Sequence, residues 1–130
     1  MRRELIDYRR SRAKETIEDA NILIGRDRLF SAVNRIYYAM FYEVTALLLT
    51  ENLSSSKHSG IRALFNEKFV KTGKVDTEMG RLFGRMFEFR EKSDYQDFAE
   101  FESEKVKELI ESAEKFIDEI DRIIDEKIPK

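Results

Sequence analysis

The stretch RLFSAVNRIYYAMFYEVTALLLTE, residues 28–51, decides the fold. From Ile36 to Leu49 it is apolar on almost every side when wound as a helix, with Glu43 and Thr45 as interruptions. A helix that is apolar all round must be covered on several sides, so this segment is predicted to be the central helix of a bundle. Its apolar run is too short and too polar to span a bilayer.

Further helices are predicted around this segment, because apolar positions recur at helical spacing and no long strand-like alternation is present. The predicted helices are Arg3–Ile24, Arg28–Glu51, Lys57–Lys71, Thr77–Lys92 and Ser103–Lys127. Short connections make neighbouring helices antiparallel. The expected fold class is all-α: an antiparallel helical bundle of about five helices with a four-helix up-and-down-like core, in a single domain over residues 1–130.

Polar and glycine residues mark where these helices should begin and end. Gly25 is expected to stop the first helix, and Thr72-Gly73 the third. Ser56 is the expected N-cap of the third helix, and Asp76 or Thr77 that of the fourth.

Composition excludes several function classes. The 130 residues include no cysteine and one histidine, His58, which excludes disulfides, thiolate metal sites and histidine-rich metal sites. No P-loop, dinucleotide-binding glycine motif, zinc motif or hydrolase nucleophile motif is present, so neither a metal nor a cofactor is expected. The N-terminus is charged and lacks the apolar region of a signal peptide, so a cytoplasmic location is expected.

The first candidate site lies on the central segment. Ser31 and Arg35 are one turn apart and share a helix face, which Tyr38 and Tyr42 extend; Asn34 adjoins the arginine. A charge entering a buried helix needs a partner. Two interpretations follow: the arginine pairs with an acidic residue of another helix while the tyrosines fill core, or a polar pocket opens at the entrance of the bundle.

The second candidate ends the fourth predicted helix. Arg90 and Asp94 are four residues apart, so a local ion pair is available, with Tyr95 packed below it. The alternative is that Arg90 points into a cleft and binds phosphate through its planar guanidinium.

The third candidate is Ser56-Lys57-His58-Ser59-Gly60 at the start of the third helix. Backbone amides at a helix N-terminus beside Lys57 and His58 suit an anion such as phosphate. The alternative is an ordinary surface or capping histidine. Residues 57–92 carry nine basic and five acidic residues, which would attract a polyanion.

Together these motifs resemble the HEPN family, and more narrowly its small stand-alone prokaryotic branch. The resemblance spans nearly the whole chain and keeps the motif order. Its motifs are Ser31-x-x-Asn34-Arg35-x-Tyr37-Tyr38-Ala-Met-Phe-Tyr42, Lys57-His58-Ser59-Gly60, Phe69-Val-Lys71-Thr-Gly73 and Arg90-x-x-Ser-Asp94-Tyr95.

The resemblance implies a helical bundle that forms a homodimer and is often encoded beside a minimal nucleotidyltransferase, as in a toxin–antitoxin pair. Active members are metal-independent endoribonucleases with an arginine followed, after four to six residues, by a histidine. Here those positions after Arg90 hold Tyr95, Gln96 and Asp97. A tyrosine is a poor general acid or base at neutral pH, so catalysis is expected to be weak or absent.

Three functions follow from these observations. The favoured one is a nucleotide- or RNA-binding module; the others are an active ribonuclease toxin and a dimeric interaction bundle without a ligand. The predicted ligand-binding residues are Ser31, Asn34, Arg35, Tyr38, Lys57, His58, Arg90, Asp94 and Tyr95. The weak catalytic candidates among them are Arg90, His58 and Tyr95.

Overall fold

The computed structural model describes residues 2–95 and 101–129, apart from the side chains of residues 93–95. This part of the chain contains α-helices and one π-helical turn, and no strand. The elements are α1 (Arg3–Gly25), α2 (Leu29–Leu49), α3 (His58–Phe65), η1 (Asn66–Val70), α4 (Thr77–Tyr95) and α5 (Ser103–Lys127). The all-α prediction is confirmed.

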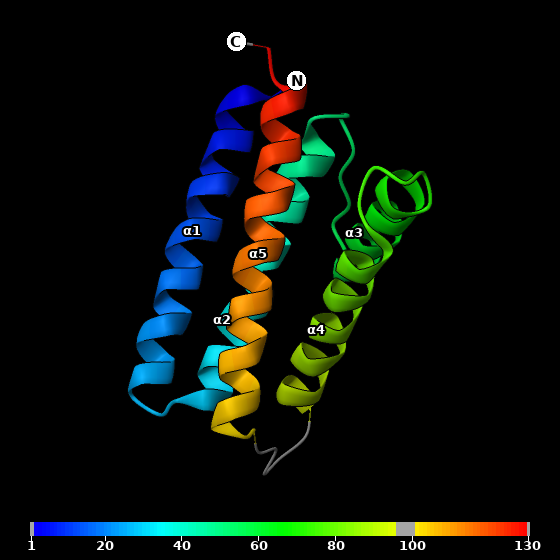
Figure 1. Cartoon of the computed structure of the whole chain (residues 1–130). Helices are drawn as coiled ribbons and strands as arrows, with labels where there is room; N and C mark the ends of the chain where they lie inside the picture. The colour runs from blue at the N-terminus through cyan, green and yellow to red at the C-terminus, as the bar shows by residue number, and fades with distance from the viewer. Residues whose placement is uncertain (1, 96–100, 130) are drawn as a thin grey trace.

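The long helices alternate in direction along the bundle (Figure 1). α1 and α2 form an antiparallel pair, α5 lies beside both, and α4 tilts away from α5 toward the end of the molecule that carries the two termini. α3 and η1 occupy the side of the bundle next to α4. α2 contacts α1, α3, α4 and α5, as expected for the central helix.

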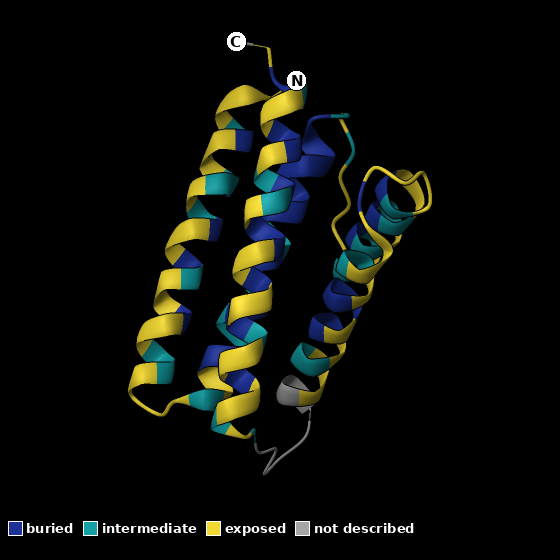
Figure 2. Ribbon diagram, viewed as in Figure 1, coloured by how far each residue is buried: buried dark blue, intermediate teal, exposed yellow. Residues whose placement is uncertain are grey.

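Burial follows this arrangement. Figure 2 shows exposed residues on the outward faces of α1 and α5, and buried residues between the helices. On α2, Tyr37, Met40 and Leu47 are fully buried. The apolar stripe of α5 is buried from Val106 to Ile124, so it packs within this chain. Burial of these side chains contributes on the order of 2 kcal/mol each.

Several helix ends differ from the predicted bounds. α2 spans Leu29–Leu49 rather than Arg28–Glu51, and α4 continues to Tyr95 rather than ending at Lys92. Gly25 is the last residue of α1, as predicted, and the left-handed turn after it falls at Asp27, whose φ is 58° and whose short polar side chain tolerates that conformation. At α3 the N-cap is Lys57 rather than Ser56, and its backbone N–H donates to the hydroxyl of Ser55 at 3.2 Å.

Two further boundaries, around the connection from η1 to α4, are as predicted. The Asp76 carboxylate accepts a hydrogen bond from the backbone N–H of Glu78 at 2.8 Å and so caps α4. Gly73 has a φ of 80°, which ends the third helical segment and is readily adopted by glycine.

The predicted third helix is divided, because its second half is the π-helical turn η1. η1 packs closely on α4 at Gly80, where an added Cβ would lie 3.0 Å from a Val70 methyl carbon. One turn further, at Gly84, an added Cβ would lie 2.7 Å from the guanidinium of Arg62. These two glycines let the α3–η1 segment pack closely on α4, where Arg62 lies, while His58 at the start of α3 contacts α2.

No helix in the described ranges combines the length and the apolar character that a membrane crossing requires.

Candidate functional site

His58 is held against α2 by two aromatic residues. The hydroxyl of Tyr37 and Nδ1 of His58 are 2.8 Å apart, a hydrogen-bond distance. The imidazole also stacks on Phe41, with ring centroids 4.2 Å apart and planes inclined by 14°. Because Tyr37 and Phe41 are one helical turn apart, α2 fixes both the position and the plane of the imidazole.

Arg90 reaches the same place from α4. Its guanidinium carbon lies 5.8 Å from the ring centroids of both Tyr37 and Tyr38. That distance is within the range of a cation–π contact. Arg90 and His58, which are distant in sequence and lie on different helices, therefore meet at one pair of adjacent tyrosines.

Arg35 completes the arrangement on the other side of Tyr38. Its guanidinium carbon is 5.0 Å from the centroid of that ring. The guanidinium donates to the side-chain oxygen of Asn34, at 2.7 Å from Nη2 and 3.2 Å from Nε. In the described part of the chain the hydrogen-bond partner of Arg35 is an amide, and no ion pair joins it to an acidic residue of another helix. We call the set Arg35, Tyr37, Tyr38, Phe41, His58 and Arg90 the Tyr37 cluster.

The hydroxyl of Tyr37 remains neutral at physiological pH. Burial is the largest influence and raises its pKa well above the usual range, although the positive charge of Arg90 opposes the shift. A neutral hydroxyl can donate to Nδ1 of His58 when the imidazole proton is on Nε2, and can accept when Nδ1 is protonated. The bond therefore orients the ring in either protonation state.

Positive charge predominates around this cluster. The Arg35 guanidinium donates to the amide oxygen of Asn34 and packs against the ring of Tyr38. The guanidinium carbon of Arg62 lies 5.2 Å from the ring centroid of Phe87. Within the described ranges, no carboxylate is within ion-pair distance of either guanidinium. Half-buried cations that are held by rings and amides keep their attraction for an external anion.

The structure brings together Arg35, Tyr38, His58 and Arg90 of the predicted ligand-binding residues, with Asn34 bound to the first of them. Ser31 and Lys57 are exposed at the N-terminal ends of α2 and α3. The side chains of Asp94 and Tyr95 lie outside the described residues, so the ion pair and packing predicted for them stay predictions.

Sequence reasoning did not assign Tyr37 and Phe41 to the site. Both lie on the helix that is apolar almost all round, where aromatic residues are expected to fill core. The available signal was their four-residue spacing, which places them on one face together with Tyr38 at its edge.

A second polar group, the Glu43 cluster, lies between α1, α2 and α5 and comprises Glu43, Asp121, Asp125 and Arg10. Arg10 donates to Asp121 and to Asp125, at 2.6 Å in each case. Glu43 is fully buried, and burial, with the neighbouring Asp121 carboxylate as a further influence, raises its pKa to about 9. Burial also opposes ionisation of Asp121, but the hydrogen bond from Arg10 and the influence of the neighbouring Glu43 outweigh it and hold the Asp121 pKa below its usual value.

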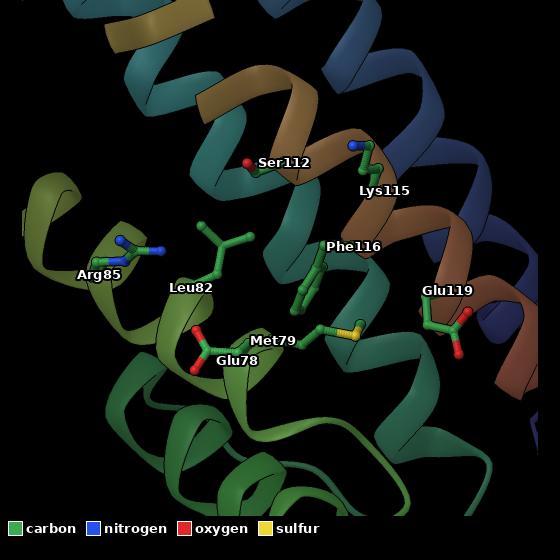
Figure 3. A pocket seen from close by; sticks show the side chains of 8 residues that line it. All are labelled: Glu78, Met79, Leu82, Arg85, Ser112, Lys115, Phe116 and Glu119. Atoms are coloured by element: carbon green, nitrogen blue, oxygen red, sulfur yellow. The ribbon is translucent and has the colours of Figure 1, made fainter. Parts of the chain in front are cut away.

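A groove of about 440 Å³ lies between α4 and α5 (Figure 3). Two acidic and two basic side chains line it, so their formal charges cancel. It shares no residue with the Tyr37 cluster. Its lining residues are Glu78, Met79, Leu82, Arg85, Ser112, Lys115, Phe116 and Glu119.

No group of three or more histidine, cysteine, aspartate or glutamate residues in the described ranges could hold a metal ion. The Tyr37 cluster offers guanidinium, imidazole and phenol groups, with the amide of Asn34 bound to Arg35 beside it. These groups bind anions, stack on planar ligands and move protons.

The fold and the site together define a class of protein: a helical bundle with arginine, histidine and tyrosine side chains gathered on one side of its central helix. The sequence model of the HEPN domain matches residues 6–123. The chain belongs to the HEPN family.

Similar proteins come from bacteria and archaea. The chain is 54% identical over 123 residues to a UPF0332 protein of Thermotoga maritima, which covers 95% of this chain and 93% of that protein. It is 36% identical over 114 residues to "Putative toxin MJ0605" of Methanocaldococcus jannaschii, with 88% and 84% covered. It is 33% identical over 106 residues to "Putative toxin MJ0142" of the same organism, with 82% and 72% covered.

Proposed function

We propose that this protein binds RNA or a nucleotide at the Tyr37 cluster. One observation supports the proposal most directly: Arg90 and His58, from different helices, both contact the adjacent rings of Tyr37 and Tyr38. Arg35 contacts the ring of Tyr38 as well. Guanidinium groups bind phosphate through two parallel hydrogen bonds, and aromatic rings stack on bases.

In this proposal Arg35 and Arg90 bind adjacent phosphate oxygens on the two sides of Tyr38. Tyr38 is half-buried, so part of its ring can stack on a base. Lys57 is exposed beside His58 at the start of α3, where it adds to the local positive charge. Asp94 and Tyr95, which follow Arg90 by about one turn, are proposed to orient its guanidinium and to stack on the ligand.

The biological role that we propose is that of a toxin in a two-component pair. It is supported by the HEPN family match and by the two relatives whose names contain the word toxin. A homodimer and a minimal nucleotidyltransferase partner are the partners proposed, on the basis of the family resemblance.

A second candidate, metal-independent cleavage of RNA, is favoured by one observation. Although no histidine follows Arg90 at the usual spacing, the fold brings His58 to the same tyrosine ring that Arg90 contacts. An imidazole can take the proton of a ribose 2′-hydroxyl as that oxygen attacks the adjacent phosphorus, and a guanidinium stabilises the charge that develops on the phosphoryl oxygens. The bond from phosphorus to the 5′-oxygen breaks, and the 5′-oxygen leaves as a hydroxyl group with a proton returned by the imidazolium or supplied by water, so the products are a 2′,3′-cyclic phosphate and a 5′-hydroxyl end.

Binding is tested by fluorescence anisotropy with a labelled single-stranded oligouridylate. Arg90→Ala and Arg35→Ala should each weaken binding and reduce the slope of log K against log salt by roughly 0.7, because one phosphate contact is lost. Arg85→Ala is the matched control, since Arg85 is exposed on the same helix as Arg90 and lies outside the cluster. Equal effects of all three substitutions would contradict a specific site.

Cleavage is tested by incubating the protein with RNA in the presence of EDTA. Cleavage that disappears in both His58→Asn and Arg90→Ala would establish the ribonuclease. RNA that stays intact at high protein concentration, while the anisotropy titration saturates, would establish binding alone.

A further inference from the structure

A separate cavity of about 190 Å³ opens directly beside the Tyr37 cluster, between α2 and the connection from α2 to α3. Phe41 belongs to both places: one ring stacks on His58 and also lines this cavity. We call the cavity the Arg9 pocket. Its polar lining residues are Arg9, Thr45, Ser54 and Ser55.

Arg9 is fixed at this pocket by a chain of hydrogen bonds. The Thr45 hydroxyl donates to the carbonyl oxygen of Tyr42 at 2.8 Å. That hydroxyl therefore has a lone pair with which to accept from Nη1 of Arg9, at 2.9 Å. Within the described residues, no other hydrogen-bond partner or ion-pair partner of Arg9 is present. A guanidinium has five N–H donors, so most of its binding capacity faces the pocket and solvent.

The composition of the pocket fits one kind of ligand. It combines a guanidinium, an aromatic ring and hydroxyl groups, and none of its lining residues in the described part of the chain is acidic. Arg9 can form charge-assisted hydrogen bonds with a phosphate, and Phe41 and Leu53 can pack against a base or sugar. Ser54 and Ser55 can form hydrogen bonds with sugar hydroxyls.

We propose that the Arg9 pocket is a second nucleotide subsite, which holds the nucleotide next to the one at the Tyr37 cluster in a single strand of RNA. The inference rests on the proposed function. It deepens that function because a shared Phe41 makes the two places continuous, so the preferred ligand is an unpaired strand rather than a mononucleotide. A duplex keeps its bases stacked and cannot spread them over both subsites.

The experiment compares uridine monophosphate with an oligouridylate of about eight nucleotides, which is within the length that single-strand binding sites cover. Arg9→Ala should weaken binding of the oligonucleotide by roughly tenfold and leave binding of the mononucleotide unchanged. Ser54→Glu should have the same effect, because Ser54 is exposed on the connection and its replacement adds a negative charge without disturbing the core. Arg122→Ala, an exposed cation of α5, is the matched control.

Each other outcome overturns the proposal and identifies the reason. Equal oligonucleotide affinity of Arg9→Ala, Ser54→Glu and the unchanged protein would show that the pocket is not a subsite while the Tyr37 cluster still binds. Absence of binding of either ligand would overturn the proposed function as well. If Arg9→Ala weakens binding only by dissociating a dimer in sedimentation velocity, the pocket is an interface between copies of the chain.

Discussion

The Tyr37 cluster and the Glu43 cluster both place charged or titratable groups against the central helix, but they satisfy those groups in different ways. In the Glu43 cluster, Arg10 is bound to two carboxylates at 2.6 Å, and its side chain is 13% exposed. In the Tyr37 cluster, Arg35 lies half-buried on an amide and a ring.

This difference separates a structural ion pair from the proposed binding site. Charges that neutralise each other inside a fold hold helices together and attract nothing from outside, whereas guanidinium groups held by rings and amides still attract an anion. The same contrast appears on α1: Arg10 faces α5 and its acids, while Arg9, one position earlier, faces α2 and a threonine hydroxyl. The two arginines of α1 are therefore held by groups of different charge.

The largest expected effect concerns the fully buried carboxyl of the Glu43 cluster. The Glu43 pKa is raised to about 9 in the fold, so the folded state binds a proton that the unfolded chain has released. The free energy of unfolding should fall by about 1.4 kcal/mol for each pH unit between the unfolded and folded pKa values, that is, as pH rises from about 4.5 toward 9. Glu43→Gln should remove this slope, because the amide is nearly the same size as the carboxyl group and stays neutral at every pH in this range. Urea unfolding at several pH values measures the slope, and an unchanged slope in the variant would show that Glu43 is ionised in the fold.

The next effect distinguishes the two clusters by their arginines. Arg10→Ala should lower the free energy of unfolding by about 3 kcal/mol, because it leaves Asp121 half-buried next to Glu43 without its main partner. Arg35→Ala should cost less than about 1 kcal/mol, the size of a partly exposed cation–π contact. Arg122→Ala, in which an exposed ion pair is lost, is the control at about 0–1 kcal/mol. Similar losses for Arg10→Ala and Arg35→Ala, measured by urea unfolding, would remove the distinction between a structural and a binding cation.

The sequence predicted most of the fold because apolar spacing determines which face of each helix is buried. α5 begins and ends at the predicted residues, Ser103 and Lys127, since its stripe repeats without interruption. The third helix was predicted less well. Its division at Asn66 depends on close packing of η1 against Gly80 of another helix, which local spacing does not contain.

The site was predicted from residue chemistry but not from its geometry. Arg35 was identified as a charge on an apolar helix, His58 by its place at a helix N-terminus, and Arg90 by its four-residue spacing from Asp94. The bond between Tyr37 and His58 joins residues 21 positions apart and depends on how α3 meets α2. From the sequence, Glu43 was identified only as an interruption of the apolar run on the central helix. Its neighbour Asp121 belongs to the many acidic residues of α5, which from charge alone are expected to face solvent.

A smaller effect tests whether Tyr37 positions His58. Tyr37→Phe keeps the buried ring but removes the hydroxyl that bonds to Nδ1, and should cost about 1 kcal/mol of stability. The chain has one histidine, so its imidazole signals in a proton NMR spectrum are assigned without ambiguity. These signals should shift in Tyr37→Phe and not in Tyr42→Phe, whose ring is not among those that contact His58. If both variants leave the imidazole signals in place, Tyr37 fills core without orienting the ring.

The smallest effect concerns the glycine that lets α3 start where it does. A Cβ at Gly60 would lie 2.1 Å from the hydroxyl oxygen of Ser55, which accepts the Lys57 N–H. Gly60→Ala must displace the Ser55 side chain and with it the turn that precedes His58, at a cost of about 1 kcal/mol or less, since the displaced group is small and exposed. Ser55→Ala in the Gly60→Ala background removes the displaced oxygen and should recover part of the loss. A double-mutant cycle measured by urea unfolding, together with the oligouridylate affinity of each variant, tests this contact. Additive losses of stability would mean that the close contact does not position His58. Recovery of both stability and affinity would connect this turn to the Tyr37 cluster and leave the Glu43 cluster unaffected.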